Sequence, residues 1–119
     1  MVNAHTTASN ALWAGVPMIT RPGQQFAARV GASLVQAAGV PQLVADSDAA
    51  YEALALRLAT EPEQLKALQA KLHTARQSCS LFDAGRYVRN LETAFRQATD
   101  RWRAGLPPQD FAVMDHTSR

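Results

Sequence analysis

The chain has 119 residues, of which 47% are hydrophobic and 18% are charged, so it has the composition of one globular domain and not of a disordered segment. Basic residues exceed acidic residues by 12 − 10 = 2 and form no dense cluster, which argues against a nucleic-acid binder. The single cysteine excludes an internal disulfide and favours a cytoplasmic location. No apolar run reaches about 18 residues, so no membrane-spanning segment is expected.

The first predicted element is a short helix. A threonine pair at 6–7 supplies an N-cap, because a threonine hydroxyl accepts a hydrogen bond from a free backbone N–H one turn further on. The alanine-rich residues 8–14 favour helix, and Gly15 ends it. Residues 18–20 (MIT) are apolar and partly β-branched and precede a Pro-Gly turn at 22–23, so they predict a short buried strand.

A second helix is predicted over residues 24–38, and Gly39 stops it. Its apolar positions recur at helical spacing and define a buried stripe, which comprises Phe26, Val30, Leu34 and Ala37. The apolar run 43–45 (LVA) follows and predicts a second short strand.

Three further helices are predicted in the second half of the chain. The first follows polar N-cap candidates at 46–48, and the second has Pro62 in its first turn, where proline is tolerated. The third begins at Asp83 and ends at Gly105. Residues 106–119 show no periodicity, so they are expected to form a frayed tail.

The order of these elements is helix, strand, helix, strand and then three helices, which is a slice of an alternating α/β pattern. Two short strands do not make a stable parallel sheet by themselves. We therefore expect a mostly helical α/β fragment with two short strands and about five helices. Further strands would have to come from residues on the N-terminal side of this slice.

The segment His5-Thr6-Thr7, at the mouth of the first helix, looks like a ligand site. The first turn of a helix presents unpaired N–H groups and a partial positive charge, and both attract phosphate. Two hydroxyls and an imidazole add further hydrogen-bonding groups there. A plain threonine cap beside a surface histidine explains the same residues, so the residues alone leave both interpretations open.

Residues 5–20 (HTTASNALWAGVPMIT), the Pro-Gly turn at 22–23 and residues 26–34 (FAARVGASL) follow one another in this order. Together they resemble the end of the catalytic domain in the protein O-GlcNAc transferase family, which includes eukaryotic enzymes and bacterial homologues with TPR repeats. The resemblance extends more loosely through 81–83 (LFD) and the last helix to about Gly105, so it covers nearly the whole chain.

In that family two Rossmann-like lobes of the GT-B fold face each other across a cleft, and UDP-GlcNAc binds mainly to the C-terminal lobe. The sugar is transferred to a protein Ser or Thr with inversion and without an essential metal or other cofactor. The resemblance implies that residues 1–105 are the C-terminal part of that lobe. It also implies that His5, Thr6 and Thr7 hold the diphosphate of a UDP-sugar donor. Asn10, where relatives commonly carry aspartate, would contact the ribose.

The resemblance further implies that much of the active site lies outside this chain, including the opposite lobe and the lysine that pairs with the phosphates. No residue here is assigned a catalytic or metal-binding role. We therefore expect the chain to contribute diphosphate contacts to a protein O-glycosyltransferase, to bind UDP-sugar weakly by itself and to turn over no substrate alone. Its expected partner is the N-terminal remainder of the catalytic domain.

A second hypothesis gives the chain a non-catalytic role as a helical module that pairs with itself or with a partner protein. Without the rest of the sheet, apolar helix faces and a strand edge lack cover, and such surfaces drive association. Trp13 and Trp102 lie on apolar helix stripes, so core packing is expected for both rather than contact with a sugar.

Overall fold

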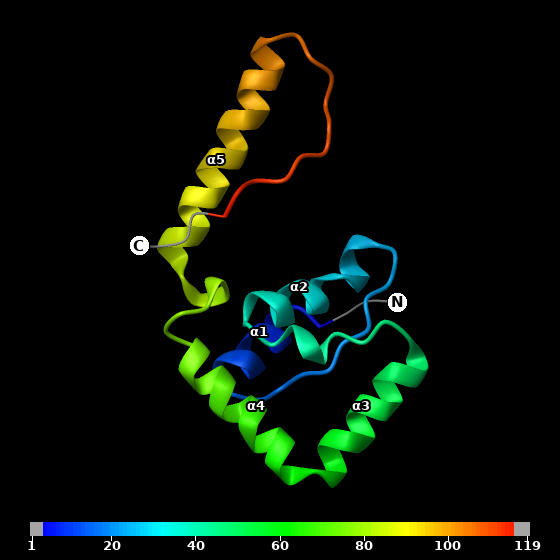
Figure 1. Cartoon of the computed structure of the whole chain (residues 1–119). Coiled ribbons are helices and arrows are strands. Elements are labelled where there is room, and N and C mark those ends of the chain that lie inside the picture. The colour runs from blue at the N-terminus through cyan, green and yellow to red at the C-terminus, as the bar shows by residue number, and fades with distance from the viewer. Residues whose placement is uncertain (1–3, 116–119) are drawn as a thin grey trace. The chain divides into compact units, whose positions relative to one another are not determined.

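A computed structural model describes residues 4–115 of the chain. The chain divides into two compact units, Met1–Phe82 and Asp83–Arg119, which we call unit 1 and unit 2 and describe separately. In the described residues, five α-helices and three short 3₁₀ helices are the regular elements (Figure 1). The prediction of a mostly helical chain with about five helices is therefore confirmed.

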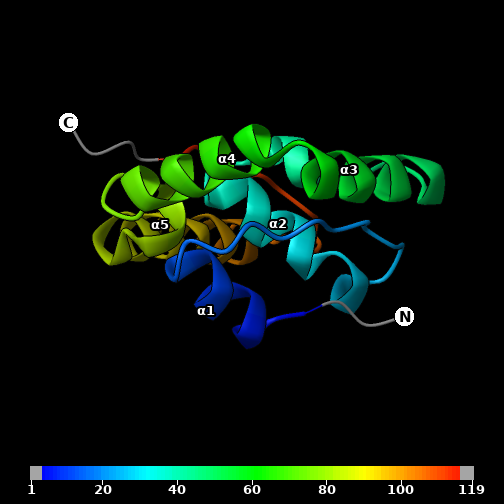
Figure 2. The same ribbon diagram turned by 90° about the horizontal axis from the view of Figure 1, so that it is seen from below.

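Unit 1 is built from four α-helices. They are α1 (Thr6–Trp13), α2 (Val30–Ala37), α3 (Asp48–Thr60) and α4 (Pro62–Ala75), joined by the 3₁₀ helices η1 (Phe26–Ala28), η2 (Pro41–Leu43) and η3 (Ser80–Phe82). Helix α2 packs against α1, and α4 packs against both α1 and α3. Figure 2 shows α1 and the α3–α4 pair on different sides of α2.

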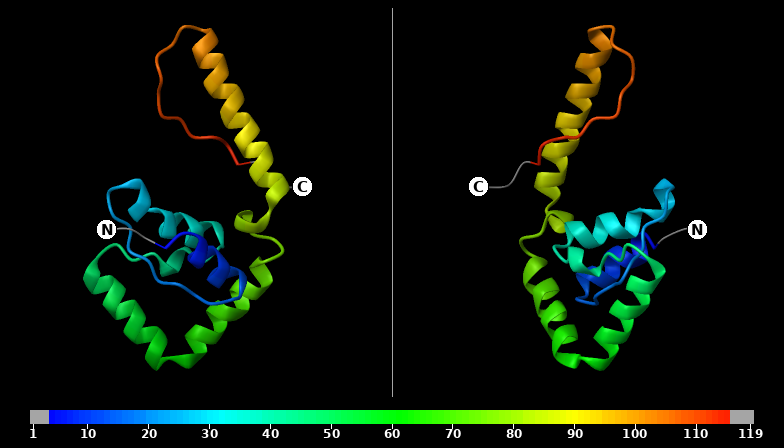
Figure 3. Two further views of the ribbon diagram at one scale, coloured as in Figure 1. Left: turned by 180° about the vertical axis from the view of Figure 1, so that it is seen from behind. Right: turned by 45° about the vertical axis from the view of Figure 1, so that its right-hand side comes forward.

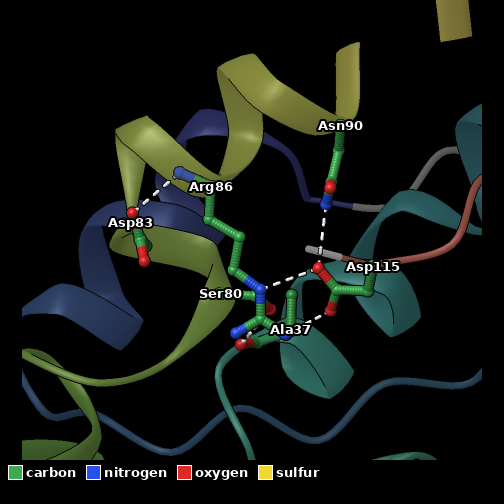
Figure 4. Close-up of polar contacts among 6 residues, drawn as sticks. All are labelled: Ala37, Ser80, Asp83, Arg86, Asn90 and Asp115. Atoms are coloured by element: carbon green, nitrogen blue, oxygen red, sulfur yellow. Dashed lines mark hydrogen bonds and ion pairs between the residues drawn. The ribbon is translucent and has the colours of Figure 1, made fainter. Parts of the chain in front are cut away.

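The core of unit 1 is apolar and draws on all four helices. It consists of Leu12, Val35, Ala38, Val40, Leu43, Leu58, Leu68 and Leu72. Burying a valine or leucine side chain stabilises the fold by about 1.5–3 kcal/mol relative to leaving it in water. The core therefore fixes α1 through Leu12, which is fully buried. At the far end of α2, the Ser80 hydroxyl donates a hydrogen bond of 3.2 Å to the Ala37 carbonyl (Figure 4).

The two predicted strands do not form among the described residues. Thr20 and Val44 make an isolated parallel bridge, in which the Thr20 N–H donates to the Leu43 carbonyl at 3.0 Å and the Ala45 N–H donates to the Thr20 carbonyl at 2.8 Å. The two segments thus run side by side in the predicted direction. The ladder stops after one bridge because, among the described residues, no further strand flanks this pair, and two short strands alone are marginal.

The second helix is shorter than predicted. Gln25 is extended, with φ −83° and ψ 156°, so the first half of the predicted segment forms η1 and α2 starts only at Val30. The later start also changes the buried face, which consists of Gly31, Ala32 and Val35. The predicted stripe residue Phe26 is instead 83% exposed.

The remaining helix boundaries agree with the predictions. The Ser47 hydroxyl caps α3 by accepting a 3.1 Å hydrogen bond from the Ala50 N–H, and Pro62 is the first residue of α4. Gly15, after α1, and Gly105, after the last helix, have φ of +83° and +69°, a left-handed conformation that glycine adopts readily. Helices α3 and α4 meet near Glu61 in a V, visible in Figures 1 and 3.

Unit 2 consists of helix α5 (Ala84–Arg103) and a tail that returns beside it. The Asp83 carboxylate caps α5 by accepting a 2.9 Å hydrogen bond from the Arg86 N–H (Figure 4). The Arg86 guanidinium pairs with both oxygens of Asp115, and the Asn90 amide donates to the same carboxylate at 2.9 Å. The described part of the predicted tail, residues 106–115, forms no helix or strand, and this network attaches its end to α5. No described helix is long and apolar enough to cross a membrane.

Candidate functional site

The N-terminus of α1 lacks a side-chain cap. The N-cap residue is His5, with φ −112° and ψ −97°, and its side chain makes no capping hydrogen bond. The prediction that a threonine caps this helix is wrong, because Thr6 and Thr7 are its first two helical residues. The first intrahelical bond runs from the Ser9 N–H to the His5 carbonyl at 3.1 Å. Within the described part of the chain, the N–H groups of Thr6, Thr7 and Ala8 therefore have no acceptor.

All four predicted site residues lie on one exposed end of α1. His5, Thr6, Thr7 and Asn10 are exposed, and Asn10 follows Thr7 and Thr6 by three and four positions, so these side chains share a helix face. Ala8, by contrast, is only 1% exposed. The structure therefore brings the predicted residues together on a helix end that the core of unit 1 holds in place.

The His5 ring connects this helix end to the loop that precedes α2. Its Nε2 lies 3.4 Å from the Ala27 carbonyl oxygen. Since a carbonyl oxygen can only accept, Nε2 is the donor in this contact. The contact orients the imidazole and places η1 next to the first turn of α1.

The electrostatics of this end favour an anion. The first turn of α1 contains no acidic residue, and the helix dipole adds a partial positive charge of about half an elementary charge. No group of three or more His, Cys, Asp or Glu residues that could hold a metal ion occurs in the described residues. The arrangement can bind and stabilise negative charge.

Neither tryptophan is buried in the core as predicted. Trp102 is 77% exposed, so the prediction is wrong for this residue. Trp13 is 50% exposed, with the Phe82 ring edge-on at 4.9 Å and the Arg76 guanidinium 4.9 Å from its ring centre. This cation–π cluster packs the end of α1 against the region after α4. It is a structural contact and lies at the opposite end of α1 from Thr6.

The loop at residues 21–29 contacts the N-cap of α1 through the Ala27 carbonyl, and here the structure departs from the predicted helix. Its stripe-like spacing predicts burial of Phe26, whereas the structure exposes this ring beside the residue that contacts His5. The Pro-Gly turn at 22–23 was a signal that the helix predicted from residue 24 begins too early, because such a turn interrupts helical structure.

Comparison with known proteins identifies the family of this chain. The model of glycosyl transferase family 41 matches residues 1–91, so the chain belongs to this family. The resemblance inferred from the sequence is thereby confirmed.

Curated relatives agree with this assignment. The chain is 39% identical over 107 residues to the UDP-N-acetylglucosamine–peptide N-acetylglucosaminyltransferase of Caenorhabditis elegans, an alignment that covers 90% of this chain and 9% of the relative. It is 39% identical over 117 residues to the probable enzyme SEC of Arabidopsis thaliana, covering 98% of this chain and 12% of the relative. The chain thus spans about a tenth of the length of these proteins.

The structure is also similar to a solved one. A mutant of the O-GlcNAc transferase of Thermobaculum terrenum superposes with a TM-score of 0.77 at 33% sequence identity, covering 86% of this chain and 20% of that chain.

Proposed function

We propose that this chain supplies diphosphate contacts to the donor site of a cytoplasmic protein O-glycosyltransferase, which transfers GlcNAc or a related sugar from a UDP-sugar to protein Ser or Thr. Residues 1–105 would form the C-terminal part of the C-terminal lobe of a GT-B fold. The names of the relatives support the donor class and the peptide acceptor.

The observation that carries this proposal is the exposed first turn of α1, where three N–H groups lack acceptors among the described residues. A diphosphate supplies several anionic oxygens that can accept these hydrogen bonds and interact with the helix dipole. Charge on the departing UDP grows as the sugar leaves. Donors already aimed at it therefore stabilise the transition state more than the ground state.

The side chains of this turn have complementary roles in the proposal. The Thr6 and Thr7 hydroxyls donate further hydrogen bonds to phosphate oxygens, and His5 contributes from the N-cap position. Asn10, one turn later on the same face, contacts the ribose through its amide. None of these groups transfers a proton or attacks the sugar, so the chain alone binds UDP-sugar and does not turn it over.

The proposal predicts weak binding of nucleotide to the isolated chain. Three charge-assisted hydrogen bonds contribute about 1.5–3 kcal/mol each, and association costs at least about 4 kcal/mol. The balance is at most about 5 kcal/mol, so the dissociation constant for UDP is expected to be no tighter than roughly 0.2 mM. Uridine lacks the diphosphate and is expected not to bind in the same range.

Titration calorimetry with UDP and uridine tests this on two matched variants. Thr7→Glu places a carboxylate in the first turn, which suits the helix dipole but repels a diphosphate. Thr7→Gln has nearly the same shape without the charge. We expect the glutamate variant to lose UDP binding. The glutamine variant lacks the Thr7 hydroxyl but adds no charge, so it should bind UDP more weakly than the wild type and more tightly than the glutamate variant. Equal binding of UDP and uridine, or equal affinities in both variants, would contradict the proposal.

A second candidate function, self-association, is favoured by helix α5. None of its residues is buried, and Tyr87, Phe95 and Trp102 are 63%, 63% and 77% exposed. The helix also carries more arginine than acidic residues, so two copies repel at low ionic strength and associate more strongly as salt screens them. Light scattering across a salt series tests this, and a monomer at every concentration and salt level would exclude it.

A further inference from the structure

Helices α3 and α4 form a groove with an apolar floor, inside the V that Figure 3 shows. A cavity of about 290 Å³ lies in this α3–α4 groove, and its apolar lining consists of Leu43, Leu54, Leu58, Ala67 and Leu68. Leu43 is fully buried, and Leu58 and Leu68 are each 8% exposed. The floor of the groove is therefore part of the core of unit 1, which holds it in place.

The rim of the α3–α4 groove is polar and positively charged. Arg57 of α3 and Lys71 of α4 line it, together with the amide side chains of Gln42 and Gln64. All four residues are exposed. None of the described residues that line the groove is acidic. The rim thus presents two positive charges beside an apolar floor.

Both cations of the rim are available to a ligand. Within residues 4–115, neither the Arg57 guanidinium nor the Lys71 ammonium forms an ion pair or a hydrogen bond. Glu61 follows Arg57 by four positions, but its carboxylate accepts a hydrogen bond from the Gln64 amide instead. A carboxylate from outside the chain would therefore find two unpaired cations here.

The shape and chemistry of the groove suit an acidic helix with an apolar face. The cavity is at the small end of ligand pockets, so it suits protruding side chains rather than a whole cofactor. Tyr51, one turn before Leu54, is 43% exposed and extends the apolar surface along α3. Amphipathic helices bind by laying their apolar side chains into such grooves. Membranes and nucleic acids draw on larger clusters of basic residues, whereas this groove carries two.

We propose that the α3–α4 groove is a docking site for an acidic amphipathic helix of a partner protein. The aliphatic side chains of that helix occupy the cavity between Leu54 and Leu68, and its carboxylates pair with Arg57 and Lys71. The groove is separate from the proposed diphosphate site, because none of its lining residues belongs to α1. A partner bound here is therefore recruited without contact with the nucleotide.

The test uses fluorescently labelled synthetic peptides and the full chain, with binding measured by anisotropy. The probe has about 14 residues, or four helical turns, with leucine once per turn and glutamate on both flanks of the leucine stripe. In one matched peptide glutamine replaces each glutamate, and in another alanine replaces each leucine. We expect the probe to bind, both matched peptides to bind about tenfold more weakly, and added salt to weaken the probe selectively.

Lys71→Gln and Lys66→Gln are matched variants, since each removes one positive charge from α4. Lys66 lies outside the groove and pairs with Glu63 at 3.3 Å. We expect Lys71→Gln and Arg57→Gln each to weaken the acidic probe about two- to fivefold and to leave the glutamine peptide unchanged. Lys66→Gln should change neither peptide.

Ala67→Phe provides an independent measurement, because Ala67 is an exposed residue of the groove wall. The larger ring fills the cavity without entering the core. It should abolish binding of the acidic probe and leave the UDP titration and the thermal unfolding of the chain unchanged.

Four outcomes overturn the proposal. The first is no binding of the acidic probe to the wild type, and the second is equal binding of the acidic and glutamine peptides. The third is an equal loss of the probe in Lys71→Gln and Lys66→Gln, which would mean that only net charge matters. The fourth uses vesicles of phosphatidylcholine with about 30% phosphatidylserine. If these bind the wild type but not Lys71→Gln while the probe does not bind, the groove recognises an anionic lipid surface instead. UDP binding is measured separately, so none of these outcomes decides the diphosphate site.

Discussion

Unit 1 and unit 2 use similar amphipathic helices in different ways. In unit 1, Leu12 of α1 is completely buried, and Leu72 of α4 is 2% exposed. In unit 2, the apolar residues of α5 recur at helical spacing, yet none is buried and Phe95 is 63% exposed. A periodic pattern thus shows which face of a helix is apolar, but it does not show what covers that face.

This difference also separates the two proposed roles. The proposed anion site at the N-terminus of α1 needs a fixed geometry, and the core of unit 1 fixes α1 through Leu12. Helix α5 instead offers an apolar surface, which suits contact with other protein rather than with a small ligand.

The largest expected difference between the units comes from leucine truncation. Leu12→Ala should lower the free energy of unfolding by about 2–5 kcal/mol, because it leaves a cavity in the core. Leu91→Ala on α5 removes a side chain that is already 37% exposed, so its effect should stay below about 1 kcal/mol. Urea denaturation of both variants measures this. Equal losses would show that α5 is as well packed as α1.

Two glycines extend the comparison to backbone packing. Gly23→Ala should cost about 1–3 kcal/mol, since the new methyl group meets the Ala28 Cβ at 2.7 Å. In Gly85→Ala, in the first turn of α5, the new methyl group lies 3.3 Å from the flexible end of the Arg89 side chain and 3.6 Å from Asp83 Oδ1, an ordinary contact. That variant should be neutral or more stable by roughly 0.5 kcal/mol. Thermal unfolding of the pair checks the signs, and a stabilised Gly23 variant would mean that the loop at residues 21–29 relaxes to admit the methyl group.

Helix capping gives a smaller effect. Ser47→Ala removes the 3.1 Å bond to the Ala50 N–H and should lower the stability of unit 1 by about 1 kcal/mol. Asp83→Ala removes the corresponding cap of α5, which should speed amide hydrogen exchange in the first turn of α5 by about fivefold. Amide exchange measured by NMR distinguishes the effect of Ser47→Ala on unit 1 from the effect of Asp83→Ala on α5. Faster exchange across unit 1 in the Asp83 variant would be inconsistent with separate units.

The smallest effect is expected for Asp115→Asn. The change keeps the shape of the side chain but removes the charge that pairs with Arg86. Because Asp115 is 49% exposed, the pair contributes no more than about 1 kcal/mol. The measurable result is faster amide exchange in residues 106–115, with no change in the melting of unit 1. If exchange in the tail stays the same, the network with Arg86 and Asn90 does not hold it.

Local signals in the sequence were sufficient where a helix boundary depends on one residue. Ser47, Pro62 and Gly105 each mark a boundary that the structure reproduces. Local signals failed where tertiary contacts determine the secondary structure. The extended Gln25 delays α2, and the strand pattern at 18–20 yields one bridge because no neighbouring strand supports it among the described residues.

The candidate site was predictable in composition but not in detail. The segment His5-Thr6-Thr7 predicted residues at the mouth of a helix, and the structure places all three at the N-terminus of α1. Phosphate binding by these residues stays a prediction. Which residue forms the N-cap depends on the backbone angles of His5, which no local pattern encodes. The exposure of Phe26 likewise depends on where α2 begins.

The most direct test of the account is an amide NMR titration of the labelled chain with UDP, followed at Thr6, Thr7 and Ala8. The account predicts that these three N–H signals move most, as expected for new hydrogen bonds to phosphate, and that the movement disappears in Thr7→Glu. Signals that stay still at millimolar UDP, or that move elsewhere in the chain while these three do not, would contradict it.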